Sequence, residues 1–166
     1  MSDTYQRLVI KSVTVFIHHE NDYLFLKRNL SKKVDPGKLN GIGGKLEIGE
    51  NFVEAAIRET QEETGLVIAE KDLKFCGVYV LEEGYDEEWV ICNFKLQLQN
   101  KQLPHGMKTD DGHFLWISED KIMDCGLELV DDLNYTFQDI LEDRLFFMTC
   151  KFDKSGKVFN LSKSII

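Results

Sequence analysis

The 166-residue sequence has only two prolines, widely spaced cysteines and no internal repeat. The scarcity of proline excludes proline-rich linkers and low-complexity segments. The four cysteines form no CxxC pair, which argues against both structural zinc and a disulfide framework. We therefore expect free thiols in a reducing compartment. The cysteines are Cys76, Cys92, Cys125 and Cys150.

Long apolar runs and basic charge are also lacking. No run approaches the length needed to span a bilayer, and Met1–Ile10 lacks the basic-then-apolar form of a secretory signal. The sequence has 20 Lys and Arg residues and 29 Asp and Glu residues, which gives a formal net charge of −9. A long nucleic acid requires a basic footprint. We expect a cytoplasmic protein with no membrane or nucleic-acid polymer as partner, and the sequence leaves its oligomeric state open.

The remaining composition is that of a folded globule, because 43% of the residues are hydrophobic and 11% aromatic. The length suits one domain over residues 1–166. Alternation and turn residues predict a mixed α/β or α+β domain. The predicted strands are Leu8–Ile17, Tyr23–Lys27, Leu73–Leu81, Trp89–Leu98, His113–Ile117, Arg144–Phe152 and Val158–Leu161, with helices over Asn51–Gly65, from Ser118, and over Asp132–Glu142.

The segments between these elements are predicted as loops or turns. His18 and His19 are expected at the surface beside the first hairpin turn. Asn29–Asn40 and Lys101–Asp111 are predicted to be polar loops. The tryptophans and the C-terminal phenylalanines are expected in the core: Trp89, Trp116, Phe146, Phe147, Phe152 and Phe159.

The helix after Gly44 carries the clearest local signals. Asn51 is a plausible N-cap with Glu54 three residues on, and Gly65 suits a left-handed C-terminal residue. The glycine-rich stretch before it, from Gly41 to Gly44, is predicted to permit close backbone approach. Five residues share one helical face suited to packing on a sheet: Val53, Ala56, Ile57, Thr60 and Thr64.

The opposite side of this helix is strongly acidic. Glu62 and Glu63 lie three and four residues after Glu59, so their like charges repel that of Glu59 by roughly 0.2–0.5 kcal/mol per exposed pair. Arg58 offsets this only in part. A hard divalent cation such as Mg²⁺ prefers carboxylate oxygens and would reverse the repulsion. A solvated acidic face is the alternative interpretation.

Gly44, Glu50 and the run from Arg58 to Leu66 reproduce the spacing of a known signature. The pattern resembles the Nudix box: Gly, five residues, Glu, seven residues, then Arg-Glu-aliphatic-x-Glu-Glu-x-Gly-aliphatic. The single departure is Thr60, where the family has an aliphatic residue. The resemblance implies the Nudix fold, an α/β/α sandwich around a mixed β-sheet.

The resemblance also implies a reaction, a cofactor and site residues. Nudix enzymes hydrolyse nucleoside diphosphates linked to another moiety, using Mg²⁺ or Mn²⁺. Arg58 would orient a catalytic glutamate, Glu50 would be structural or an outer ligand, and Lys45 would contact phosphate. One glutamate of the box would act as general base, and which one is left open. The implied metal ligands are the Gly44 carbonyl, Glu59, Glu62 and Glu63.

Two further stretches resemble the family branch that hydrolyses oxidised purine nucleoside triphosphates. Leu39–Lys45 resembles Trp-Asn-Gly-Phe-Gly-Gly-Lys, in which the asparagine contacts the purine. Asp131 and Asp132 resemble a pair that reads the base edge, one carboxyl being kept protonated so that it donates. Structural alternatives remain: Asn40 as a turn residue and the aspartates as a helix N-cap. Leu129 replaces that branch's stacking tryptophan, which leaves Tyr135 or Phe25 to stack on a base.

The leading hypothesis is a Mg²⁺-dependent pyrophosphohydrolase that converts a nucleoside triphosphate to the monophosphate and pyrophosphate. The expected substrate is a small-molecule nucleotide, with 8-oxo-dGTP foremost. ADP-ribose, nucleotide sugars, dinucleoside polyphosphates and ordinary dNTPs are alternative substrates. A non-catalytic nucleotide-binding or protein-binding module is the alternative of another class.

Overall fold

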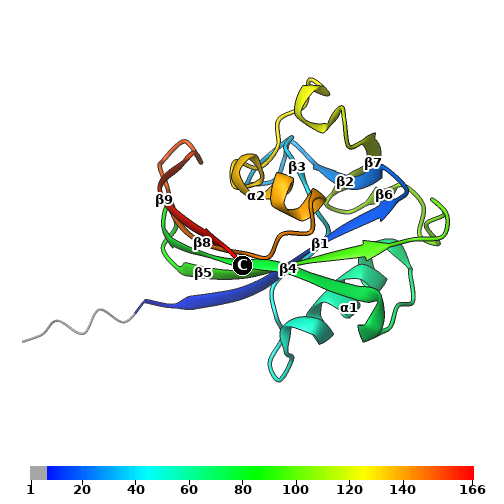
Figure 1. Cartoon of the computed structure of the whole chain (residues 1–166), viewed down its shortest axis with the longest axis horizontal. Helices are drawn as coiled ribbons and strands as arrows, with labels where there is room; N and C mark the ends of the chain where they lie inside the picture. Colours follow the sequence, from blue (N-terminus) through cyan, green and yellow to red (C-terminus); the bar gives the residue numbers. More distant parts are fainter. Residues whose placement is uncertain (1–6) are drawn as a thin grey trace, which may run out of the picture.

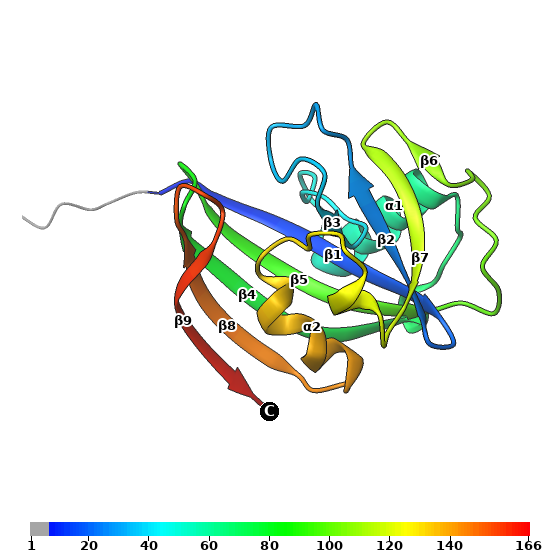
Figure 2. The same cartoon turned by 90° about the horizontal axis from the view of Figure 1, so that it is seen from above.

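The computed structural model describes residues 7–166, so part of the Met1–Ile10 segment considered above lies outside it. The described residues form one nine-stranded mixed sheet in the order β6-β7-β2-β1-β5-β4-β8-β9, with β3 paired to β2 (Figures 1 and 2). The β1–β5 and β4–β8 pairs are parallel. The strands are β1 Val9–His19, β2 Asp22–Arg28, β3 Leu39–Asn40, β4 Leu73–Glu83, β5 Glu88–Gln97, β6 Lys108–Thr109, β7 Gly112–Ser118, β8 Phe146–Phe152 and β9 Val158–Ile165.

Two α-helices, α1 (Phe52–Thr64) and α2 (Leu133–Leu141), cover opposite faces of the sheet (Figures 1 and 2). Side chains alternate along a strand, and β1 shows the result. Its Val13, Val15 and Ile17 pack in the cluster that includes the alanines of α1. Phe16 packs in the other cluster, with Phe137 of α2. The predicted mixed sheet between helices is confirmed.

The first hairpin is confirmed, but its strands reach further than predicted. β1 runs to His19 and β2 begins at Asp22. His18 stacks on Tyr23 with ring centroids 5.1 Å apart, and the His19 ring bonds to the Leu98 carbonyl at 3.0 Å. Both histidines are half-buried. They lie beside the hairpin turn as predicted, but they are partly exposed instead of fully exposed.

Three other local predictions need correction. The helix expected from Ser118 is absent, because Ser118 ends β7 and only a 3₁₀ turn, Ile122–Asp124, follows. The loop predicted up to Asn40 ends earlier, since β3 pairs with β2 there. Phe147 and Phe159 are 39% and 42% exposed. Along β8, alternate residues face away from the core, so only every second one is buried.

All four cysteines are free, three of them buried and Cys125 half-buried, as expected. Within residues 7–166, no helix is long and apolar enough to cross a membrane.

Candidate active site

Local signals define both ends of α1 as predicted. The Asn51 side chain accepts hydrogen bonds from the backbone N–H groups of Val53 and Glu54 at 2.8 and 3.0 Å. Glu54 accepts in return from the Asn51 N–H at 2.8 Å, which completes a capping box. Gly65 ends the helix with φ of 77°. These caps fix where along the sheet the acidic turns of α1 lie.

The packing face of α1 is confirmed with one exception. Ala55, Ala56, Thr60 and Thr64 are buried, so the short Thr60 side chain sits where the helix meets the sheet. Ile57 was also predicted there. It is instead half-buried and lines a cavity of about 580 Å³ on the outer side of the helix.

The glycine stretch lies directly against β1, as predicted. The Gly44 carbonyl accepts a hydrogen bond from the Val13 N–H at 2.9 Å. A Cβ added at Gly43 would lie 2.0 Å from the Val13 carbonyl oxygen, and one added at Gly44 would lie 2.3 Å from Oε1 of Glu59. Only glycine therefore allows this segment to pass between β1 and the acidic face of α1.

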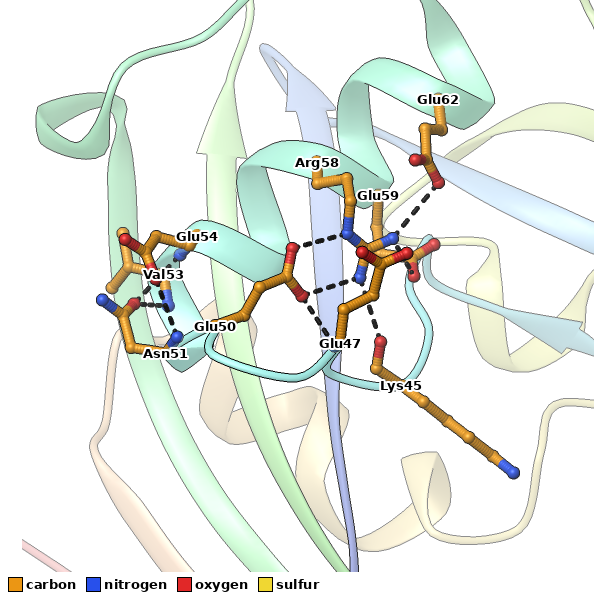
Figure 3. A network of polar contacts seen from close by, with 9 residues as sticks. All are labelled: Lys45, Glu47, Glu50, Asn51, Val53, Glu54, Arg58, Glu59 and Glu62. Atoms are coloured by element: carbon orange, nitrogen blue, oxygen red, sulfur yellow. Dashed lines mark hydrogen bonds and ion pairs between the residues drawn. The ribbon is translucent and has the colours of Figure 1, made fainter.

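Arg58 is the centre of the polar network on this face (Figure 3). Its guanidinium donates twice to Glu50, at 2.7 and 3.0 Å, and once to the Lys45 carbonyl at 3.0 Å. It also donates to Glu59 at 2.8 Å and to Glu62 at 3.2 Å. These bonds lower the pKa of Glu50 and raise that of Arg58. One residue thus ties the loop before α1 to two of the three predicted metal-ligating glutamates.

Glu63, the third of these glutamates, has no such partner. Its Oε2 atom is buried and accepts no hydrogen bond from any residue between 7 and 166. Burial, with the charges of Glu59 and Asp111, raises the pKa of Glu63 to about 8. Burial also raises the pKa of Glu59, although Arg58 opposes the shift. A buried carboxylate oxygen beside two further carboxylates fits a hard divalent cation, which supplies the missing charge.

These acids line a cavity of about 380 Å³ whose opposite wall was not singled out from the sequence. The sequence predicts only a polar loop over Lys101–Asp111. Its last residues face α1 across the cavity. The feature of the sequence that could have identified this wall is the pair Asp110–Asp111, which directly precedes a strand. The cavity is lined by Glu59, Glu62, Glu63, His105, Lys108, Thr109, Asp110 and Asp111.

The described side chains do not enclose an ion. Within residues 7–166, no group of three or more His, Cys, Asp or Glu side chains is arranged to hold a metal. One oxygen each of Glu59 and Glu62 instead accepts a hydrogen bond from Arg58. Glu62 is otherwise the most open of the three, with a side chain 58% exposed. The donor set fits a cation, provided that these two carboxylates turn from Arg58 towards Glu63.

Arg28, the last residue of β2, was also missed. Its Nε atom is buried without a hydrogen-bond partner among the described residues. Burial raises the pKa of both Glu63 and Tyr85, and the charge of Arg28 opposes both shifts. An arginine with an unused buried donor is suited to a phosphate oxygen.

The fold brings the predicted base-reading segments together. Leu39 and Leu129 form a parallel β-bridge, so Asn40 lies beside the segment that leads to Asp131 and Asp132. The Asn40 side-chain oxygen accepts from the Gly41 N–H at 2.8 Å, as a turn residue would. Its amide nitrogen makes no hydrogen bond with a described residue, so it can still donate.

The two aspartates differ sharply. Asp131 accepts from the Val158 N–H at 2.6 Å and from the Lys157 ammonium at 3.3 Å, so both its oxygens hold the β8–β9 hairpin. Asp132 is only 5% exposed, and burial raises its pKa to about 6 despite a hydrogen bond with Tyr79. Asp132 makes no side-chain cap to α2. Asp132 therefore does not share the role of Asp131 in holding the β8–β9 hairpin.

The predicted stacking residues and Lys45 differ in their burial and surroundings. Phe25 is fully buried against Phe137, 5.4 Å between ring centroids, so its assignment as a stacking residue is wrong. Tyr135 is 40% exposed. The Lys45 ammonium lies 5.1 Å from the ring centroid of Trp89, the residue that neighbours Tyr85. Lys45 thus faces the aromatic side of the sheet, away from α1.

A family model described as "NUDIX domain" matches residues 9–136. Similar solved structures include the mutator MutT protein from Bacillus halodurans, 20% identical, with a TM-score of 0.76 over 94% of this chain and 97% of that one. The MutT protein from Methanosarcina mazei Go1 is 20% identical, with a TM-score of 0.66 over 84% of this chain and 99% of that one. A bifunctional NMN adenylyltransferase/ADP ribose pyrophosphatase from Francisella tularensis, solved with AMP and a Mn ion, is 18% identical, with a TM-score of 0.62 over 84% and 43%. At these identities, the structural likeness shows the fold alone.

Proposed function

We propose a specific reaction for this chain, which belongs to the NUDIX family and is a Nudix hydrolase: Mg²⁺-dependent cleavage of a nucleoside triphosphate to the monophosphate and pyrophosphate. One observation carries the proposal. Glu63 has a buried oxygen with no partner, beside Glu59 and across a cavity from Asp111. Burial of this carboxylate is costly to the fold, because the backbone N–H of Gly43 and the charge of Arg28 offset it only in part, and a divalent cation removes the remaining cost.

The cation would be held by Glu59, Glu62 and Glu63 together with the Gly44 carbonyl, with Mn²⁺ as a substitute for Mg²⁺. When bound, it would neutralise the phosphates and lower the pKa of the attacking water. One of the box glutamates accepts a proton from that water, which attacks phosphorus while the bond to the bridging oxygen breaks. Arg58 holds Glu59 and Glu62 beside the cavity until the cation binds and the two carboxylates turn towards it, and the buried Nε of Arg28 donates to a phosphate oxygen.

For the base, we propose a purine held by Asn40 and Asp132, with 8-oxo-dGTP as the leading substrate. The free amide of Asn40 donates to a purine acceptor. Asp132 accepts when ionised and donates when protonated, and its pKa of about 6 makes both states accessible near neutral pH. Asp131 stabilises the pocket indirectly, through its hydrogen bonds with Val158 and Lys157. Trp89 and Tyr85, in ring contact at 6.2 Å, replace Phe25 as candidates for stacking.

The test is a screen with excess Mg²⁺ over 8-oxo-dGTP, the four dNTPs, ADP-ribose and UDP-glucose. Triphosphate cleavage is followed through released pyrophosphate, and the sugar nucleotides through a phosphatase that acts on their products. We expect the oxidised purine to be preferred. Preference for ADP-ribose or UDP-glucose would refute the base assignment while keeping the hydrolase chemistry. No turnover of any nucleotide, with Mg²⁺ still bound, would favour a binding module instead.

A further inference from the structure

His105 joins the β5–β6 loop to the C-terminal end of α1 through two hydrogen bonds. Its backbone N–H donates to the Thr64 carbonyl at 3.0 Å. Its ring Nδ1 lies 3.1 Å from the Glu62 carbonyl oxygen. A carbonyl only accepts, so Nδ1 must carry the proton in this contact. Both carbonyls belong to the last turn of α1, where helical partners are lacking.

Gly65 makes room for this contact. Its φ of 77° ends the helix, and a Cβ there would lie 2.7 Å from Pro104 Cβ and 2.7 Å from His105 Cδ2. The glycine therefore serves two purposes in this chain. It reverses the backbone, and it lets the Pro104–His105 segment pack directly on the helix end.

The segment held in this way carries one wall of the acidic cavity. Lys108, Asp110 and Asp111 follow within a few residues of His105 and face the glutamates of α1. The far end of the wall is tied to β2, because the Asn29 N–H donates to the Asp111 carbonyl at 2.8 Å. Among residues 7–166, the two bonds of His105 are the hydrogen bonds that tie the Lys101–Asp111 loop to α1.

His105 and Glu62 also line both cavities at this end of the molecule, the inner one of about 380 Å³ and the outer one of about 580 Å³. Among the lining residues, Glu62 and His105 are the two that the cavities share. Loss of the ring bond would leave only the backbone bond to Thr64 between this loop and α1, so the loop wall could shift relative to Glu62.

We propose that His105 is a positioning residue that sets the spacing between the α1 glutamates and the Lys108–Asp111 wall. It acts through the Glu62 carbonyl and does not touch the substrate. The proposal rests on the proposed function, because the spacing matters only if the inner cavity holds a divalent cation. It deepens that function by assigning the geometry of the cation site to a residue outside the Nudix box.

The test compares three substitutions at one position, with Mn²⁺ as the probe and no substrate present. His105→Asn places an amide N–H near the position of Nδ1 and preserves the bond to Glu62, whereas His105→Gln places it near Nε2. His105→Ala removes the side-chain bond to Glu62 and keeps the backbone bond to Thr64. Mn²⁺ affinity is measured by electron paramagnetic resonance, and hydrogen exchange is followed in peptides covering residues 103–111. His113→Ala, at an exposed histidine of β7, is the matched control.

We expect His105→Ala and His105→Gln to weaken Mn²⁺ binding about tenfold and to accelerate exchange in the loop, while His105→Asn stays within about twofold of the wild type. His113→Ala should match the wild type. Wild-type affinity in His105→Ala, or equal rescue by asparagine and glutamine, would overturn the positioning role alone. Absence of Mn²⁺ binding by the wild-type chain would overturn the proposed metal-dependent function, and the positioning role with it.

Discussion

Arg58→Lys tests the network that organises the candidate site. The guanidinium makes five hydrogen bonds, two to Glu50 and one each to Glu59, Glu62 and the Lys45 carbonyl. Lysine keeps the charge but concentrates three donors at one point, so at least two of these bonds are lost. Charge-assisted bonds contribute about 1.5–3 kcal/mol each when they are shielded from solvent. The side chains of Arg58, Glu50 and Glu59 are 20%, 17% and 13% exposed, whereas that of Glu62 is 58% exposed, so its bond contributes less. We expect the free energy of unfolding to fall by about 2–4 kcal/mol.

The assay is urea denaturation at neutral pH with a chelator present, so that metal binding does not contribute. Arg144→Lys is the control, because Arg144 also pairs with a buried carboxylate, Asp139, at 2.8 Å. Asp139 keeps a second partner, Lys163 at 2.6 Å, and Arg144 is 44% exposed. That substitution should cost under about 1 kcal/mol. Equal losses for the two variants, or a loss below about 1 kcal/mol for Arg58→Lys, would refute the central role of Arg58.

Three further predictions concern the acidic groups. Glu62→Gln or Glu63→Gln should remove most turnover at saturating Mg²⁺ with unchanged circular dichroism, and near-normal activity of either variant would mean that the metal site is misassigned. The raised pKa of Glu63, about 8, predicts that the metal-free protein loses stability as pH rises from about 4.5 through about 8. It also predicts that Mn²⁺ affinity rises up to tenfold per pH unit below pH 8. Thermal melts and Mn²⁺ titrations over this range check both, and a Glu63→Gln variant with the same pH profile as the wild type would count against the assignment. Asp132→Asn should change the ranking of purine substrates while Asp131→Asn lowers the melting temperature, and an unchanged ranking would remove Asp132 from the base pocket.

Features set by neighbouring residues could be predicted from the sequence. The α1 caps depend on Asn51, Glu54 and Gly65, which all lie within or beside the helix, so the sequence pattern alone predicts them. The close approach at Gly43 and Gly44 followed from the same run of small residues. These signals are local, so tertiary contacts did not need to be known.

Features set by distant contacts could not be predicted. The wall opposite α1 depends on His105 bonding to the end of α1 and on Asp111 bonding to Asn29, and neither pairing leaves a periodic trace. Asp131 bonds to Val158 of another hairpin, which its sequence neighbours do not reveal. Phe25 lies in a strand that is buried on both faces, so alternation gave no indication of which side it occupied.

The most direct test of the central claim is the identity of the products formed from 8-oxo-dGTP by the wild-type chain with Mg²⁺, with and without a chelator, beside Glu63→Gln. The account predicts the nucleoside monophosphate and pyrophosphate in equal amounts, with formation abolished by the chelator and nearly abolished by the substitution. Release of orthophosphate, or turnover that survives both metal removal and Glu63→Gln, would contradict the assignment of the α1 carboxylates as a metal-dependent pyrophosphohydrolase site.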